Sequence, residues 1–258
     1  MIFDSHMHSK FSTDSNMRIE DAIKISKNKN IGLIITEHMD LDYYNPNEFR
    51  CDVPAFFEEY NKFRCNTLGL GIELGLSEST LKSNENIAKN FEFDFILGSI
   101  HNINGSDIYS EYCKLSKNNY PKKDYFQKYL DSILSCVKLY NNFDSLSHID
   151  YLCRYSYYDD NEIDIEIYKD TIAEIVQTLL EKGKVMELNS SRLNNGKAQE
   201  SLLKIYRLYN DLGGKYLTIG SDAHTANDIG RNFKIALDMC EFLKLKGVYF
   251  KKRKIELF

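Results

Sequence analysis

Short apolar runs of strand length alternate along this chain with longer amphipathic stretches of helix length. The clearest apolar runs cover residues 2–3, 32–35, 70–74, 93–97, 146–147, 185–188 and 216–219, and a weaker one covers 248–252. The helix candidates between them cover residues 18–29, 54–66, 124–141, 163–182, 198–212 and 228–246. Strands that alternate with helices predict βα units and a mainly parallel sheet, so the expected fold class is α/β.

The length of the chain fits one domain. It has 258 residues, and a single α/β barrel typically needs about 250. The sequence contains no internal repeat and no Pro/Gly/Ser-rich linker, and it has only three prolines. We therefore expect residues 1–258 to form a single domain.

Charge and cysteine usage exclude several classes of protein. The net charge is −5 with acidic and basic residues mixed along the chain, whereas a nucleic-acid binder normally presents a basic surface.

No apolar run approaches the roughly 18 residues of a membrane span, and the first residues lack the pattern of a signal peptide. The six cysteines form no CxxC pair, which indicates reduced thiols. We expect a cytoplasmic protein without a nucleic-acid or membrane partner; the oligomeric state stays open.

The histidines follow a single rule of position. There are six, and each closely follows an apolar run, in IFDSHMH, LIITEH, ILGSIH, SLSH and LTIGSDAH: His6, His8, His38, His101, His148 and His224. One such histidine is more often a hydrogen-bonded structural residue than a ligand. Carboxylates follow the same runs, however, at Asp4, Glu37, Glu73, Glu187 and Asp222. A coincidence of this size is hard to attribute to packing.

In a closed parallel barrel, the C-terminal ends of all strands meet at one face. Neutral imidazoles and carboxylates gathered there form a site for divalent transition metals, each needing three or four protein ligands. The candidates exceed the needs of one ion, so we expect two or three ions. Because residues i and i+2 of a strand point the same way, His6 and His8 can bind one ion together.

The order of these motifs carries a family resemblance. DSHMHS, ITEH, GIEL, GSIH, SHID and GSDAH resemble, in order, the motifs of the polymerase and histidinol phosphatase (PHP) superfamily. The resemblance runs from Asp4 to His224, and length and motif details are most similar to the stand-alone histidinol-phosphatases of the PHP type. It implies a distorted (β/α)7 TIM-like barrel with a metal site at the C-terminal ends of the strands. The implied ions are zinc, iron or manganese.

The resemblance also implies a ligand set. The first ion would be held by His6, His8, Glu73 and Asp222; the second by Glu73, as a bridge, with His101 and His148; the third by Asp14, His38 and His224. Some relatives carry a histidine where this chain has Asp14, and an aspartate fits the histidinol-phosphatase branch better. Asp4 and Glu37 would orient imidazoles from behind.

Two arginines follow strand ends, in SHIDYLCR and ELNSSR. Either one alone fits surface charge equally well. Together, Arg154 and Arg192 favour a bidentate phosphate clamp, because the guanidinium matches phosphate geometry. In the histidinol-phosphatases that this chain resembles, arginines after these strands contact the phosphate.

The implied activity is that of a metal-dependent phosphomonoesterase. Its substrate would be L-histidinol phosphate, hydrolysed to L-histidinol and phosphate in histidine biosynthesis by attack of a metal-bridging hydroxide. Asp222 and His224 are the candidates for catalytic proton transfer. No serine or cysteine nucleophile motif is present, so we expect no covalent phospho-enzyme.

Three alternatives stay open. Another PHP phosphoesterase would act on a nucleotide, sugar phosphate or phosphotyrosine. A regulatory metal-binding barrel without catalysis predicts lost ligands, yet every ligand position is filled. A polymerase-associated proofreading module fits the length and the acidic charge poorly. The aromatic-rich segments 43–57 and 109–125 either recognise the imidazole end of the substrate or pack their loops.

Overall fold

A computed structural model describes residues 1–112 and 121–258. Its main sheet has the strand order β1-β2-β3-β4-β7-β8-β9-β10-β11. The strands are β1 (Phe3–Asp4), β2 (Gly32–Met39), β3 (Leu68–Gly75), β4 (Phe95–Ser99), β7 (Ser145–Leu146), β8 (Val185–Asn189), β9 (Tyr216–Gly220), β10 (Lys246–Lys251) and β11 (Lys254–Leu257). All neighbours are parallel except the β10–β11 pair. The predicted α/β class with a mainly parallel sheet is confirmed.

Backbone hydrogen bonds join the two ends of the row of parallel strands. Just beyond β1, the amide of Ser5 donates to the carbonyl of Ile219 at the end of β9, at 2.9 Å. The amide of Asp222 donates to the carbonyl of His6 at 2.8 Å, and the amide of His8 to that of Ala223 at 2.8 Å. On its other side from β11, strand β10 pairs with only the first three residues of β9. The strands therefore form a ring at their C-terminal ends, as the expected distorted barrel requires.

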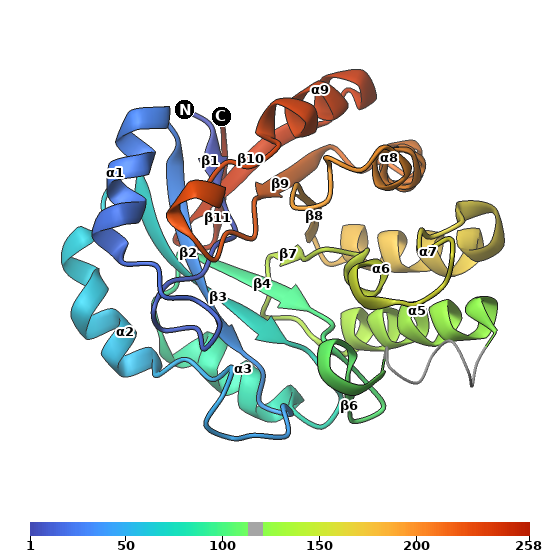
Figure 1. Ribbon diagram of the computed structural model, residues 1–258, viewed down its shortest axis with the longest axis horizontal. Coiled ribbons are helices and arrows are strands. Elements are labelled where there is room, and N and C mark those ends of the chain that lie inside the picture. The colour runs from blue at the N-terminus through green and yellow to red at the C-terminus, as the bar shows by residue number, and fades with distance from the viewer. Residues whose placement is uncertain (113–120) are drawn as a thin grey trace.

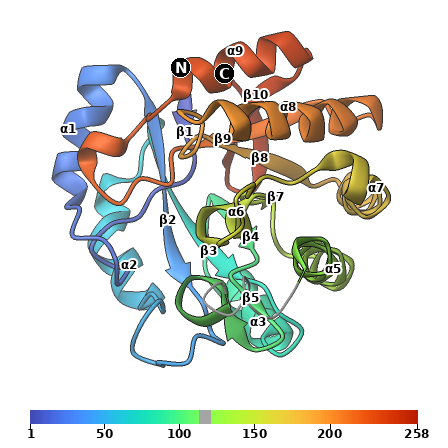
Figure 2. The same cartoon turned by 45° about the vertical axis from the view of Figure 1, so that its right-hand side comes forward.

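The helices lie around the outside of the strands, and the two chain termini lie close together (Figures 1 and 2). The helices are α1 (Ile19–Lys29), α2 (Val53–Tyr60), α3 (Leu81–Asn90), α5 (Lys122–Leu139), α6 (Tyr151–Tyr155), α7 (Ile165–Glu181), α8 (Gly196–Asp211) and α9 (Phe233–Leu243). Shorter elements are the helical turns η1 (Asn61–Phe63), η2 (Ile108–Tyr112) and η3 (Ala226–Asp228), and the hairpin of β5 (Asn102–Ile103) and β6 (Ser106–Asp107).

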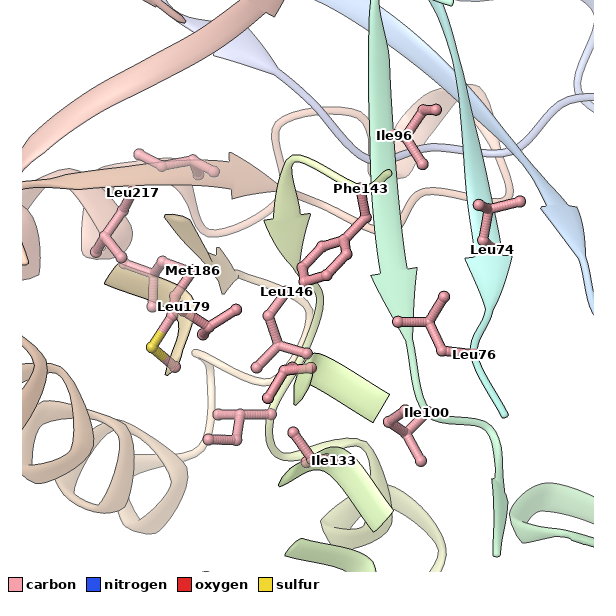
Figure 3. Packing of buried hydrophobic residues seen from close by; sticks show 14 of the residues in the cluster. Leu74, Leu76, Ile96, Ile100, Ile133, Phe143, Leu146, Leu179, Met186 and Leu217 are labelled. Carbon is pink, nitrogen blue, oxygen red and sulfur yellow. The ribbon is translucent and has the colours of Figure 1, made fainter. Parts of the chain in front are cut away.

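The parallel strands from β1 to β9 in the main sheet are almost entirely buried on both faces, as parallel strands covered by helices usually are, whereas β11 is exposed. On the outer face, Ile96, Leu146 and Met186 belong to one apolar cluster with Ile133 of α5 and Leu179 of α7 (Figure 3). A second cluster consists of Phe3, Ile34, Phe95, Leu97, Val185, Val248 and Phe250. Most of its members come from the first half of their strands. Apolar packing therefore occupies the end of the ring opposite to the strand ends that carry the histidines.

The predicted elements are present, with differences at their ends. The predicted helix 54–66 ends at Tyr60. The predicted helix 228–246 begins only at Phe233, because Gly230 and Asn232 adopt φ values of 70° and 57° that a helix does not accept. It ends at Leu243, which frees residue 246 to start β10. Helices α3 and α6 and the strands of the β5–β6 hairpin were not anticipated.

The structure tests two other expectations only in part. No helix among the described residues has the length and the apolar character needed to cross a membrane. The aromatic-rich segment 109–125 is described at its two ends, while residues 113–120 lie outside the described residues. The single-domain assignment and the cytoplasmic location stay predictions.

Candidate active site

The six histidines come together at the C-terminal ends of the strands. His38 lies in β2 and is paired in register with Glu73 of β3, so these two side chains are neighbours across the sheet. The others follow the strands: His6 and His8 follow β1, His101 follows β4, His148 follows β7, and His224 follows β9. All except His224 are buried. The six side chains therefore gather at one end of the sheet, as expected.

One group of donors has the spacing of a tetrahedral site. The two Nε2 atoms of His6 and His8 are 3.2 Å apart. Asp222 Oδ1 lies 3.5 Å from the first and 3.3 Å from the second. Glu73 approaches them at 3.4 Å with Oε1 and at 3.5 Å with Oε2. Four ligands placed tetrahedrally at about 2.1 Å from an ion stand roughly 3.4 Å from one another. The donors therefore already stand where such an ion needs them.

Glu73 also faces a second group of donors. Its Oε1 lies 3.0 Å from His148 Nε2 and 3.4 Å from His101 Nε2. These two imidazole nitrogens are 3.5 Å apart. Glu73 thus stands between two sets of histidines, the position of a bridging carboxylate.

The third expected group is more open. Asp14 Oδ2 lies 2.9 Å from His224 Nε2 and 3.6 Å from His38 Nε2. The side chain of His224 is 29% exposed, against 10% for that of His38. His8, His38 and His224 could also share an ion, because one ring nitrogen from each lies within 4.8 Å of the others.

Other side chains fix the orientation of the imidazole rings. Glu187 Oε1 lies 2.7 Å from His6 Nδ1, and Asp40 Oδ1 lies 2.8 Å from His101 Nδ1. Such carboxylates turn the opposite nitrogen toward a metal and strengthen it as a ligand. The sequence marked Glu187 only as a strand-end carboxylate and missed Asp40. A signal for Asp40 was present, because it stands two residues after His38 and so falls on the same side of the strand.

The two carboxylates expected behind the ligands behave differently. Glu37 acts on His8 through Ser12, whose hydroxyl donates to Glu37 Oε2 at 2.6 Å and lies 3.1 Å from His8 Nδ1. Among the described residues, Asp4 makes hydrogen bonds to backbone amides and to the Ser221 hydroxyl, and none to an imidazole ring. Its carboxylate accepts hydrogen bonds from the amides of Ser221 and Gly230, at 2.9 and 2.8 Å. Asp4 therefore holds the backbone that leads into Asp222.

The cluster attracts positive charge. Burial opposes protonation of His6, yet Glu187, Glu73 and Asp222 together raise its pKa well above the ordinary value. Burial and the neighbouring His38 and His224 lower the pKa of His8 to about 3, so this ring is neutral, the form that binds metals. Glu73 is fully buried, and its Oε2 lies 2.9 Å from His38 Nδ1 and 3.5 Å from His8 Nε2. A buried carboxylate that faces several imidazole nitrogens is suited to bind a cation together with them.

A cavity of about 400 Å³ opens above the cluster. His38, His101, His148, Asp222 and His224 form its floor, and His6, His8 and Glu73 are buried beneath. Its walls are formed by Asp14, Asp40, Tyr43, Phe49, Asp107, Tyr109, Tyr151, Arg154 and Tyr155. Both aromatic-rich segments noted in the sequence contribute to these walls.

Of the two arginines, Arg154 lines the cavity. Its Nη1 donates to Asp222 Oδ2 at 2.6 Å, while its Nε and Nη2 are buried without a hydrogen bond to the described residues. Arg192 is not part of the cavity lining. Its Nη1 donates to Asp150 Oδ2 at 2.6 Å, and its Nη2 pairs with Glu162. The phosphate role of Arg192 stays a prediction.

Comparison with known proteins places the chain in a family. The PHP domain family model matches residues 4–191. The probable histidinol-phosphatase of Clostridium acetobutylicum is 46% identical over 98% of both chains, and the histidinol-phosphatase of Lactococcus lactis subsp. lactis is 28% identical over 86% of this chain and 84% of its own. The crystal structure of the Lactococcus lactis histidinol phosphate phosphatase, complexed with zinc, L-histidinol and phosphate, superimposes with a TM-score of 0.90 at 25% identity, over 99% of this chain and 98% of that one. The chain therefore belongs to the PHP domain family and groups there with the histidinol-phosphatases.

Proposed function

We propose that this protein is a metal-dependent phosphomonoesterase that hydrolyses L-histidinol phosphate to L-histidinol and phosphate. One observation carries the proposal. The buried donors around Glu73 have the spacing of metal ligands, and Arg154, with two unused hydrogen-bond donors, lies directly against one of them. Candidate metal ligands beside a guanidinium that retains two donors form an arrangement suited to a phosphate ester. The 46% identity to a probable histidinol-phosphatase supports the choice of substrate.

The residues fit two or three divalent ions. His6, His8, Glu73 and Asp222 would hold one, Glu73 with His101 and His148 a second, and Asp14, His38 and His224 a third. Imidazole and carboxylate ligands suit zinc, iron and manganese. Such ions supply an activated water and positive charge that stabilises a transferring phosphoryl group.

Arg154 would bind the phosphate. Its Nε and Nη2 are the two donors that remain after Nη1 is used by Asp222. A phosphate oxygen that accepts from them gains a charge-assisted hydrogen bond inside a cavity where water competes poorly. Asp222 also fixes the guanidinium, so little side-chain entropy is lost on binding.

Asp222 and His224 would assist the transfer of a proton to the leaving oxygen. Asp222 Oδ1 lies 3.9 Å from His224 Nδ1, and Asp222 Oδ2 accepts the hydrogen bond from Arg154. These two side chains therefore form the cavity floor beside the phosphate subsite. His224 is the more exposed of the two and can exchange protons with water more readily.

A turnover panel tests the choice of substrate. Phosphate release by metal-loaded protein would be measured with L-histidinol phosphate, a nucleoside monophosphate, a sugar phosphate and phosphotyrosine. We expect kcat/KM to be highest for L-histidinol phosphate by at least tenfold. A higher kcat/KM for any other member would assign the protein to a different phosphomonoester.

A further inference from the structure

A row of aromatic rings leads from the histidine cluster to the mouth of the cavity. The Tyr151 ring centroid lies 4.8 Å from that of His148, and Tyr155 follows at 5.1 Å from Tyr151. Tyr109, from η2, is 5.2 Å beyond Tyr155 and is 58% exposed. This row covers one wall from the floor to the surface.

A second aromatic row stands on the wall formed by the segment after β2. The Phe49 ring packs edge-on at 5.4 Å from His38, and Tyr43 is 4.7 Å beyond Phe49. Phe49 has φ of 52°, a left-handed conformation that aromatic residues rarely adopt. Its amide donates to Thr13 Oγ1 at 2.7 Å, which helps to hold it there. The backbone thus accepts strain at the position that places this ring over the cavity.

Asp107, at the end of β6, adds a carboxylate to the same cavity. The other carboxylates of the cavity, Asp14, Asp40 and Asp222, each pair with a histidine. Asp107 pairs with no cation among the described residues. Its only hydrogen bond there is accepted by Oδ1 from the Ser110 amide at 2.6 Å, and this leaves Oδ2 available.

Asp107 lies within electrostatic reach of both aromatic rows. Burial is the main cause that raises the pKa of Tyr43, and the negative charge of Asp107 adds to it. The same two causes act on the pKa of Tyr151, in the other row. A carboxylate that lines the same cavity as two rows of aromatic rings, and that has no cationic partner among the described residues, is a suitable environment for an organic cation, because carboxylates and ring faces both attract positive charge.

We propose that Asp107, with Tyr43 and Tyr109, binds the ammonium group of L-histidinol phosphate and thereby selects the leaving group. This inference rests on the proposed function. L-Histidinol carries an aliphatic amine that is protonated at neutral pH. Arg154 and Asp107 would then hold the anionic and cationic ends of one substrate. Leaving groups without a cation, such as sugars, would gain nothing from Asp107, and anionic ones would be repelled.

Asp107→Asn tests this assignment with little structural change, because Asn Oδ1 can still accept from the Ser110 amide. For L-histidinol phosphate we expect kcat/KM to fall about ten- to a few-hundredfold, the range for a lost charge-assisted hydrogen bond. For p-nitrophenyl phosphate, which has no ammonium group, kcat/KM should stay within twofold. Inhibition by L-histidinol should weaken in parallel, while inhibition by inorganic phosphate should not change. Asp131→Asn on α5, outside the cavity, is the matched control and should resemble the parent.

Two results would overturn the assignment of Asp107. An equal loss on both substrates would mean that Asp107 supports the hairpin or the cluster rather than the leaving group. Unchanged kinetics with L-histidinol phosphate would mean that the carboxylate does not contact the substrate. A parent protein that is active on p-nitrophenyl phosphate but inactive on L-histidinol phosphate would overturn the proposed function itself, and this assignment with it.

Discussion

Arg154 donates a 2.6 Å hydrogen bond to Asp222, a carboxylate that also lies within 3.5 Å of the ring nitrogens of both His6 and His8. The candidate phosphate-binding group and a candidate metal ligand are therefore in direct contact. A phosphate is therefore expected beside the candidate metal ligands and against Arg154.

Replacing Arg154 should impair catalysis far more than folding. Loss of a charge-assisted hydrogen bond costs about 1.5–3 kcal/mol, so Arg154→Ala should lower kcat/KM roughly ten- to a few-hundredfold for every phosphomonoester that the enzyme accepts. Arg154→Lys should recover only part of the loss, because an ammonium cannot make the paired contact. Steady-state kinetics with two substrates check this. A loss confined to one substrate would mean that Arg154 contacts the leaving group and not the phosphate.

Arg192 is expected to combine two effects. Arg192→Ala should lower kcat/KM, because Asp150, which Arg192 holds, directly precedes the helix that carries Arg154. It should also lower the Tm by roughly 5 °C or more, because the buried carboxylates of Asp150 and Glu162 would lose their cationic partner. Thermal unfolding followed by circular dichroism measures the second effect. If kcat/KM and Tm of Arg192→Ala both matched the parent values, Arg192 would be only a surface charge.

Glu73→Gln should be the most damaging single change among the ligands. The variant keeps the shape of the side chain but replaces a carboxylate that faces two groups of histidines. We expect it to lose at least one equivalent of metal and more than a hundredfold in kcat, as measured by elemental analysis and phosphate release. Glu174→Gln on the exposed face of α7 is the matched control. Full metal content and rate in Glu73→Gln would show that Glu73 is not the bridge.

Gly220 is required by close approach. A Cβ at this position would stand 2.3 Å from Glu187 Oε1 and 2.3 Å from His6 Cβ. Gly220→Ala should therefore displace His6, reduce metal content and lower kcat/KM at least tenfold. Gly196→Ala has no atom within 4 Å of the added carbon and should leave metal content and rate unchanged. Equal behaviour of the two variants would mean that the site tolerates movement of His6.

The sequence predicted where the candidate ligands gather because their rule of position is local. Each histidine lies at or just after the end of an apolar run, and parallel strands must bring their C-terminal ends together. The pairing of His6 with Glu187 could not be predicted in this way, because it depends on how closely β1 and β8 approach through the space left by Gly220.

Other parts of the structure depend on contacts between segments that are distant in the sequence. Arg192 follows a strand end as Arg154 does, yet Asp150 and Glu162, from two other segments, hold it away from the cavity lining. The late start of α9 depends on the left-handed conformation of Asn232. Asparagine tolerates this conformation, but the presence of an asparagine does not predict it. Helix α3 has too few apolar residues for its period to be read from the sequence.

The most direct test of the central claim joins metal content to turnover of one substrate. Purified protein would be stripped with a strong chelator, reloaded separately with zinc, iron or manganese, and assayed for phosphate release from L-histidinol phosphate while bound metal is counted. The account predicts no measurable turnover in stripped protein and recovery of activity as two or three ions bind per chain. Full activity in stripped protein, or fully loaded protein that releases no phosphate from L-histidinol phosphate, would contradict it.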